Sequence, residues 1–111
     1  MLLLIASCKK EGIGGKSTIE GIVAHHGKPI PYSIVYIKYG AKDFPGIDVT
    51  TYSDHTTADA NAHYEYHNLR KGFYYLYAVG FDNSISQSVS GGLGVSIKYN
   101  KTSETDVPVT E

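Results

Sequence analysis

Hydrophobic and polar residues alternate along most of this chain with a period of two, the pattern that a half-buried β-strand produces. Gly and Pro interrupt the pattern, as at Pro29, Pro31 and Pro45-Gly46, and no stretch shows a helical period. The alternating runs predict strands at residues 17–24, 33–39, 48–53, 63–67, 72–82, 84–90, 93–99 and 105–109, with residues 54–62 as a polar link. Short strands at this spacing predict a β-sandwich or a β-barrel.

The composition is that of a single folded domain. The chain has 111 residues, of which 41% are hydrophobic and 19% are charged, and its formal net charge is -1. A protein that binds nucleic acid needs a basic face that neutralises phosphates. No run of Lys or Arg is longer than two residues, as at Lys9-Lys10. The charge pattern therefore predicts a partner other than nucleic acid.

The N-terminal segment passes from apolar residues through small ones to a cysteine and then to polar residues. Its last part, Ile5-Ala6-Ser7-Cys8, resembles the bacterial lipobox, in which the cysteine carries diacylglycerol before the signal peptide is cleaved. The positively charged part of a signal peptide does not precede it, which is expected if the true start lies upstream of Met1. We therefore expect Cys8 to be lipidated and to anchor the protein to a bilayer.

Cys8 is the one cysteine of the sequence, so no disulfide partner exists for it. An exported protein has little use for a lone thiol, which favours the lipid anchor over a buried cysteine in a core strand. The glycine-rich residues 12–17 that follow predict a flexible tether. We thus expect residues 1–17 to be signal remnant, lipobox and tether, and residues 18–111 to be the folded domain.

Five segments of the predicted strand region follow one another in a familiar order. They are Glu20-Gly21-Ile22-Val23, Gly27-Lys28-Pro29-Ile30-Pro31, Val35-Tyr36-Ile37-Lys38, Asp59-Ala60-Asn61-Ala62-His63-Tyr64-Glu65-Tyr66 and Leu69-Arg70-Lys71-Gly72-Phe73-Tyr74-Tyr75-Leu76-Tyr77-Ala78. The series resembles the carboxypeptidase regulatory-like domain, a transthyretin-like (prealbumin-like) domain common in exported Bacteroidetes proteins. The resemblance implies an all-β fold, a seven-stranded antiparallel β-sandwich. With the lipobox, it implies an outer-membrane lipoprotein of a Gram-negative cell envelope, on either its periplasmic or its surface side.

One position departs from the pattern of this family. Its members usually carry Gly where Ala62 stands, in the turn before the strand at residues 63–67. If that turn needs a positive φ, either Ala62 is strained or Asn61 takes the left-handed conformation instead. The short pattern Asp59-x-Asn61 lacks the later Gly and Glu of a calcium loop and predicts an Asx turn.

The family register also implies which side chains face solvent. It turns Tyr74, Leu76 and Ala78 into the core, and it places the strands at residues 33–39 and 72–82 side by side in one sheet. Aromatic and aliphatic side chains would then gather on the outer face, where they would form an exposed patch. The members of this predicted patch are Ile34, Tyr36, Phe73, Tyr75 and Tyr77. The alternative is that a loop, such as residues 42–48, covers it.

Histidines suggest a second kind of site. His63, Glu65 and His67 share one parity on a predicted strand, so two of them could bind a metal ion with a third ligand from elsewhere. The possible third ligands are His25, His26 and His55. The alternative is an ordinary solvated strand face, which we prefer because no second-shell partner can be named. We expect no cofactor.

The sequence offers little for an enzyme. It has no Gly-x-Ser-x-Gly motif, and its last residues lack the Tyr-Arg-Gly-Ser ending of the transthyretin-like hydrolases of 5-hydroxyisourate. The resemblance to the regulatory-like domain also implies no catalytic residues. We therefore predict a non-enzymatic envelope lipoprotein that contacts a protein or a glycan through the exposed aromatic face. The alternative is a small metal-binding protein that uses the strand histidines.

Overall fold

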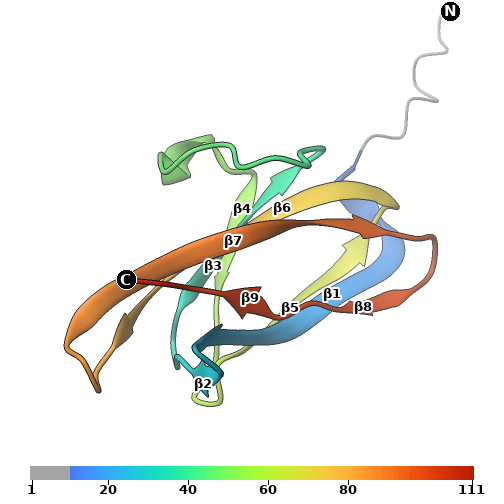
Figure 1. The fold of residues 1–111 in the computed structure, drawn as a ribbon. Coiled ribbons are helices and arrows are strands. Elements are labelled where there is room, and N and C mark those ends of the chain that lie inside the picture. The colour runs from blue at the N-terminus through green and yellow to red at the C-terminus, as the bar shows by residue number, and fades with distance from the viewer. Residues whose placement is uncertain (1–10) are drawn as a thin grey trace, which may run out of the picture.

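The chain folds into two β-sheets that face each other, in a computed structural model that describes residues 11–111 (Figure 1). The strands are β1 (Ile13–His25), β2 (Lys28–Pro29), β3 (Ile34–Tyr39), β4 (Asp54–Thr57), β5 (His63–Leu69), β6 (Gly72–Asp82), β7 (Gln87–Ile97), β8 (Thr102–Glu104) and β9 (Val107–Pro108), with a 3-10 helix η2 (Val49–Thr51). The prediction of an all-β sandwich is confirmed. In this part of the chain no helix has the length and apolar character to span a bilayer.

The first sheet is built around the long strand β1. β5 and β2 pair with β1 antiparallel, whereas β8 and β9 run parallel to it. The expected purely antiparallel arrangement is therefore wrong here, because the chain leaves β7 and returns along β1 in the same direction. The expected count of seven strands is not confirmed either, since residues 11–111 form nine, of which β2 and β9 have two residues each.

The second sheet has the order β4-β3-β6-β7, and all its pairs are antiparallel. The strand predicted at residues 48–53 is instead helix η2, which Asp48 caps by accepting a hydrogen bond from the backbone N–H of Thr50. The predicted polar link contains strand β4. The two strands expected at 84–90 and 93–99 form one strand, β7, because Gly91 and Gly92 keep their places in the ladder with β6.

The folded domain begins earlier than predicted. β1 starts at Ile13, and the supposed tether is held by hydrogen bonds: Gly12 donates to the hydroxyl of Tyr74 over 2.8 Å, and Ser17 donates to the carbonyl of Lys98 over 2.5 Å. Ser17 is fully buried beside a bulge in the β1–β5 pairing. The boundary between residues 17 and 18 is thus wrong, and Cys8 and its lipobox lie outside the described residues.

The core lies between the sheets and contains three tyrosines among aliphatic side chains. Tyr64 and Tyr66 of β5 donate their hydroxyl hydrogens to the carbonyls of Thr105 and Val35, over 2.5 and 2.6 Å. Tyr74 packs inward from β6 together with Leu76 and Ala78, as predicted, and all three are fully buried. These hydrogen bonds satisfy the polar ends of rings that contribute large buried areas.

The turn before β5 decides between the two alternatives for Ala62. Ala62 itself has a φ of 65°, the left-handed region that disfavours a side chain with a Cβ. It is fully buried, and its N–H donates to the carbonyl of Asp59. The Asx turn is present as well, because Asp59 Oδ1 accepts from the backbone N–H groups of Asn61 and His63. Those hydrogen bonds hold the pKa of Asp59 below its usual value.

Candidate functional site

The predicted patch lies on the outer face of β3 and β6, which are neighbours as expected. Tyr36 stands opposite Tyr77, and Lys38 stands opposite Tyr75. Phe73 is 42% exposed, and Ile34, Tyr36 and Tyr75 are half-buried. Tyr77 differs from the prediction, since only 8% of it is exposed. The five predicted residues therefore share one face, but only Phe73 is well exposed and Tyr77 is covered.

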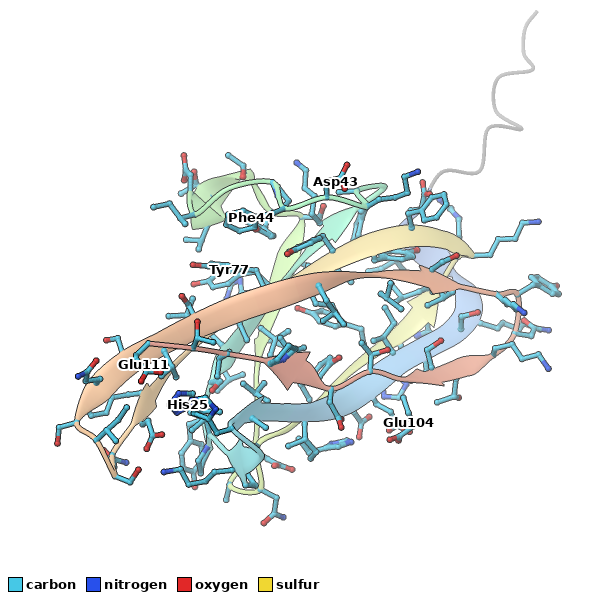
Figure 2. All side chains as sticks on the ribbon, viewed as in Figure 1. His25, Asp43, Phe44, Tyr77, Glu104 and Glu111 are labelled. Carbon is cyan, nitrogen blue, oxygen red and sulfur yellow. The ribbon has the colours of Figure 1, made fainter. Side chains whose placement is uncertain are left out.

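The cover is the segment 40–53, the green loop above the second sheet in Figure 1. The ring of Phe44 packs 5.9 Å from that of Tyr75 and 5.5 Å from that of Tyr77, measured between ring centroids. Tyr52 stacks on Tyr77 at 5.8 Å and also contacts Tyr36. Figure 2 shows Phe44 on this loop above Tyr77. The alternative that a loop covers the patch is thus correct for Tyr77.

The neighbouring strand β7 presents only small side chains on the same outer face. Its residues opposite the β6 aromatics Phe73, Tyr75 and Tyr77 are Ser96, Gly94 and Gly92. A Cβ on Gly94 would collide with the carbonyl oxygen of Lys42, so a glycine is required where the loop crosses the strand. A wall of aromatic rings on β6 therefore stands beside a low floor on β7.

Wall, floor and loop enclose a groove of about 340 Å³, named here the aromatic groove. It is lined by Phe44, Ile47, Tyr75, Tyr77, Ser90, Gly91 and Gly92. Phe44 is 51% exposed and Ile47 is 76% exposed. Burial and the nearby charge of Asp43 raise the pKa of Tyr75, and burial raises that of Tyr52 to about 12, so both phenols stay neutral donors. The groove combines apolar surfaces with a few polar groups, as ligand sites commonly do.

Phe44, Ile47 and Tyr52 are the groove-face residues that sequence reasoning missed. The turn Pro45-Gly46 marked the loop, but nothing in a pattern of period two shows where an irregular segment packs. One signal was available: two large hydrophobic residues flank Pro45-Gly46 in a segment with no strand period. Such residues in a loop must either pack on a neighbouring surface or remain exposed.

The predicted metal candidates lie on the outer face of the first sheet, on β5. The nitrogens of His63 face two carboxylates: Nε2 lies 3.5 Å from Glu20 Oε1, and Nδ1 lies 3.6 Å from Glu65 Oε2. Ligand atoms of these three residues lie within 4.8 Å of one another. His67 contacts Glu65 but stands outside this group, so the pairing of His63 with His67 on one ion is wrong.

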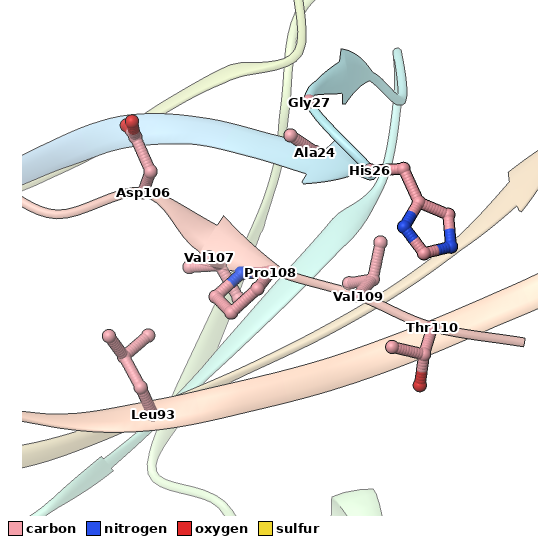
Figure 3. Close-up of a pocket in the computed structure, with 9 residues that line it drawn as sticks. All are labelled: Ala24, His26, Gly27, Leu93, Asp106, Val107, Pro108, Val109 and Thr110. Carbon is pink, nitrogen blue, oxygen red and sulfur yellow. The ribbon is translucent and has the colours of Figure 1, made fainter.

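The other predicted third ligands lie elsewhere. His55 packs against Tyr36 on the second sheet, with ring centroids 5.7 Å apart. His25 and His26 lie at the far end of β1, where they form a separate group with Glu111. Beside that end a second groove, of about 490 Å³, follows β9 between β1 and β7 (Figure 3). It is lined by Ala24, His26, Gly27, Leu93, Asp106, Val107, Pro108, Val109 and Thr110.

No protein-family model matches the chain, and no curated protein matches it. Among solved structures it is similar to the crystal structure of a "putative carbohydrate binding protein" from Pseudomonas aeruginosa, with a TM-score of 0.62 and 13% sequence identity. The match covers 94% of this chain and 93% of the other. At this identity the likeness concerns the fold, and it extends over nearly the whole domain.

Proposed function

We propose that this protein is a non-enzymatic carbohydrate-binding module that holds a glycan in the aromatic groove. The observation that carries the proposal is the arrangement of Phe44 and Tyr75 beside Gly91 and Gly92, where the absence of side chains makes room for the Tyr75 ring, whose Cε1 would lie 2.8 Å from a Cβ on Gly92. A sugar ring has apolar C–H faces and a polar rim. Flat aromatic walls next to a floor without side chains suit such a ring, which a bulky β7 would exclude.

The polar groups of the groove fit the same ligand. The hydroxyl of Tyr75 and the side chain of Ser90 lie among the lining residues, and each can donate and accept hydrogen bonds. Ile47 and Phe44 remain largely exposed, which is unfavourable unless a ligand covers them. The groove thus offers apolar contact and hydrogen bonds together.

The solved neighbour supports the glycan over a protein partner. It is described as a "putative carbohydrate binding protein", and it shares this fold over nearly its full length. Proteins that share a fold often bind different ligands, so the proposal depends on the residues of the groove. Exposed tyrosines can also pack against a protein, which makes a protein partner one outcome of the test.

Glycan arrays and affinity electrophoresis in polysaccharide gels test the proposal. We expect wild type to bind a definable set of glycans, and Phe44→Ala and Tyr75→Ser each to weaken binding at least about tenfold. The matched control is Tyr99→Ser, which removes a tyrosine that is 67% exposed and lies outside the groove. Binding that is equal in all variants contradicts the proposal. If the protein instead binds another protein and no glycan, and the same variants lose that binding, then the groove is still the binding site but its ligand is a protein.

We further propose that the module is a lipoprotein of the Gram-negative outer membrane, anchored through Cys8, and that it is related to the carboxypeptidase regulatory-like domains. The lipobox-like Ile5-Ala6-Ser7-Cys8 supports the anchor. Labelled palmitate should enter the protein in cells and be lost in Cys8→Ala, with Ser7→Gly as a control that keeps a small residue before the cysteine. Equal labelling of wild type and Cys8→Ala would contradict the anchor.

A further inference from the structure

The end of β1 carries a histidine in an unusual position. His25 continues the inward parity of Ile19 and Val23, and only 4% of it is exposed. Its ring lies between two carboxylates, with Nδ1 2.8 Å from Asp82 Oδ2 and Nε2 2.6 Å from Glu111 Oε1. Figure 2 shows His25 and Glu111 together at this end of the sandwich.

Asp82 is held firmly at the end of β6. It is 2% exposed, and its Oδ1 accepts from Lys28 Nζ at 3.0 Å, from the Ser84 N–H at 2.9 Å and from the Ser84 hydroxyl at 2.6 Å. Asp82 Oδ1 thus accepts three hydrogen bonds while Oδ2 faces His25 Nδ1, which is the arrangement of a carboxylate. A fixed carboxylate against Nδ1 places a proton on that nitrogen. It leaves Nε2 as the atom that can bind a ligand.

Two more side chains with possible metal-ligand atoms lie near His25 Nε2. His26 is the next residue, in a two-residue hairpin turn with a φ of 53°, and its ring centroid lies 4.3 Å from that of His25. Glu111 comes from the segment after β9, and 47% of its side chain is exposed. One ligand atom from each of His25, His26 and Glu111 lies within 4.8 Å of the others.

We propose that His25, His26 and Glu111 bind a divalent cation of the zinc class, with Asp82 as the carboxylate that orients His25. Two imidazoles and one carboxylate are a common set of protein ligands for zinc that leaves a fourth position open. A buried carboxylate hydrogen-bonded to the second nitrogen of a ligand histidine is the usual support of such a site. The structure supplies this support before any ion binds.

The distances require only a small adjustment. Two atoms about 2.1 Å from one tetrahedral ion lie about 3.4 Å apart, so Glu111 must withdraw from Nε2 by about 1 Å. Its exposed side chain is free to do so. Nε2 binds the ion only without a proton, so binding should become weaker at low pH. His26 also lines the groove beside β9 (Figure 3).

The second group of donors, Glu20, His63 and Glu65, lacks these features. His63 turns one nitrogen toward each carboxylate, so neither nitrogen is fixed as a ligand by a buried partner. All three residues are at least partly exposed on an open sheet face. His63→Asn is therefore a suitable control for removal of a histidine from a cluster of similar composition.

Zinc titration of the full chain tests the site, in a Cys8→Ser background so that no thiol contributes. We expect one zinc ion per chain by calorimetry, and intense visible absorption from cobalt in its place as the sign of a tetrahedral site. His26→Asn should weaken binding at least about tenfold, because it removes a ligand. It should keep the fold, because Asn followed by Gly suits this hairpin turn. Glu111→Gln should weaken binding similarly without altering any packed residue.

Three results would overturn the proposal. The first is unchanged zinc affinity in both His26→Asn and Glu111→Gln. The second is loss of binding in His63→Asn, which would move the ion to the other cluster. The third is the lack of cobalt absorption in wild type. Ring resonances of His25 and His26 that shift on zinc addition, while those of His55 stay in place, would support it independently of affinity.

Discussion

The outer faces of the two sheets follow the same alternation of side chains but meet solvent in different ways. On the first sheet the outward positions of β1 and β5 carry Glu20, His63 and Glu65, which pair with one another in water. On the second sheet the outward positions of β6 are aromatic, and the segment 40–53 folds over them. The first face is therefore polar enough to lie in water without a covering segment. The second face is aromatic, is partly covered by the segment 40–53, and has a groove beside that segment.

The contrast shows how this sandwich can support a binding site without a change of fold. The first face is solvated, and its charged side chains contact one another while remaining partly exposed. The second face depends on matched pairs, in which each large residue of β6 stands opposite a Gly or Ser of β7. The aromatic groove forms where the aromatic rings of β6 stand beside the small residues of β7. We therefore expect substitutions on the second face to alter the aromatic groove, and substitutions on the first face to affect only their immediate contacts.

The largest effect should come from high pH, and it acts through the tyrosines beneath the first sheet. Burial raises the pKa of Tyr64 and of Tyr66 far above the ordinary value of 10.0. A raised pKa means that both groups stabilise the fold fully below pH 10 and that this contribution falls as pH rises above it. We expect cooperative unfolding in strong alkali, with the part of the tyrosinate absorbance that comes from Tyr64 and Tyr66 rising together with the loss of circular dichroism.

The variant Tyr66→Phe sharpens this expectation. It removes one of the two ionising groups, so the alkaline midpoint should move upward, although stability at neutral pH falls by about 1 kcal/mol with the lost hydrogen bond to Val35. Tyr52, on the groove side, has a pKa of about 12 and serves as the comparison on the second face. A midpoint that falls in Tyr66→Phe, or ionisation of Tyr64 and Tyr66 that precedes unfolding, would contradict the assignment.

A second prediction concerns a substitution on β7 that should disrupt the aromatic groove. Gly94→Val puts a branched side chain where β7 passes under the carbonyl of Lys42, so the loop must lift. We expect the free energy of unfolding to fall by about 1–3 kcal/mol, as in overpacked sites, and glycan binding to be lost with it. Urea unfolding and gel retardation measure the two effects. The matched control is Ser88→Val, on the same face of β7 but opposite Phe81, which should leave both unchanged.

Much of the sandwich could be predicted because its strands obey a period of two. β6 was bounded correctly from Gly72 to Asp82, and its inward residues are buried as expected. The pairing of β3 with β6, and hence the patch, followed from the family register. The strand bounds depend on local pattern, which a sequence displays directly, whereas the pairing of β3 with β6 was expected only from the resemblance.

The missed features depend on contacts between distant segments. Gly12 to Ser17 looks flexible by composition, yet hydrogen bonds to Tyr74 and Lys98 fix it as part of β1. The burial of Tyr77 depends on the loop that carries Phe44, and the group at His25 needs Asp82 and Glu111, which lie 57 and 86 residues away. No local period encodes such approaches, so the groove and the histidine site required the structure.

A third prediction concerns the turn that opens β5 on the first sheet. Ala62 adopts a φ of 65°, which glycine tolerates without a Cβ clash. Ala62→Gly should therefore raise the free energy of unfolding by about 1 kcal/mol, less the entropy that glycine adds to the unfolded chain. Ala60→Gly is the matched control, because Ala60 is exposed and has no positive φ, and it should destabilise slightly. Equal effects of the two changes would contradict the strain at Ala62.

The smallest effect is expected on the outer face of the first sheet. Glu65→Thr removes contacts with His63 and His67, but it also removes a like charge directly opposite Glu20, and threonine suits a strand. Exposed ion pairs contribute little, so the free energy of unfolding should change by less than about 0.5 kcal/mol, and by less still at high salt. Tyr75→Thr, the same replacement on the other face, should cost clearly more, because it removes the contact with Phe44. Urea unfolding of both variants measures the difference. A loss in Glu65→Thr equal to that in Tyr75→Thr would mean that the ion pairs of the first face are as structural as the rings of the second.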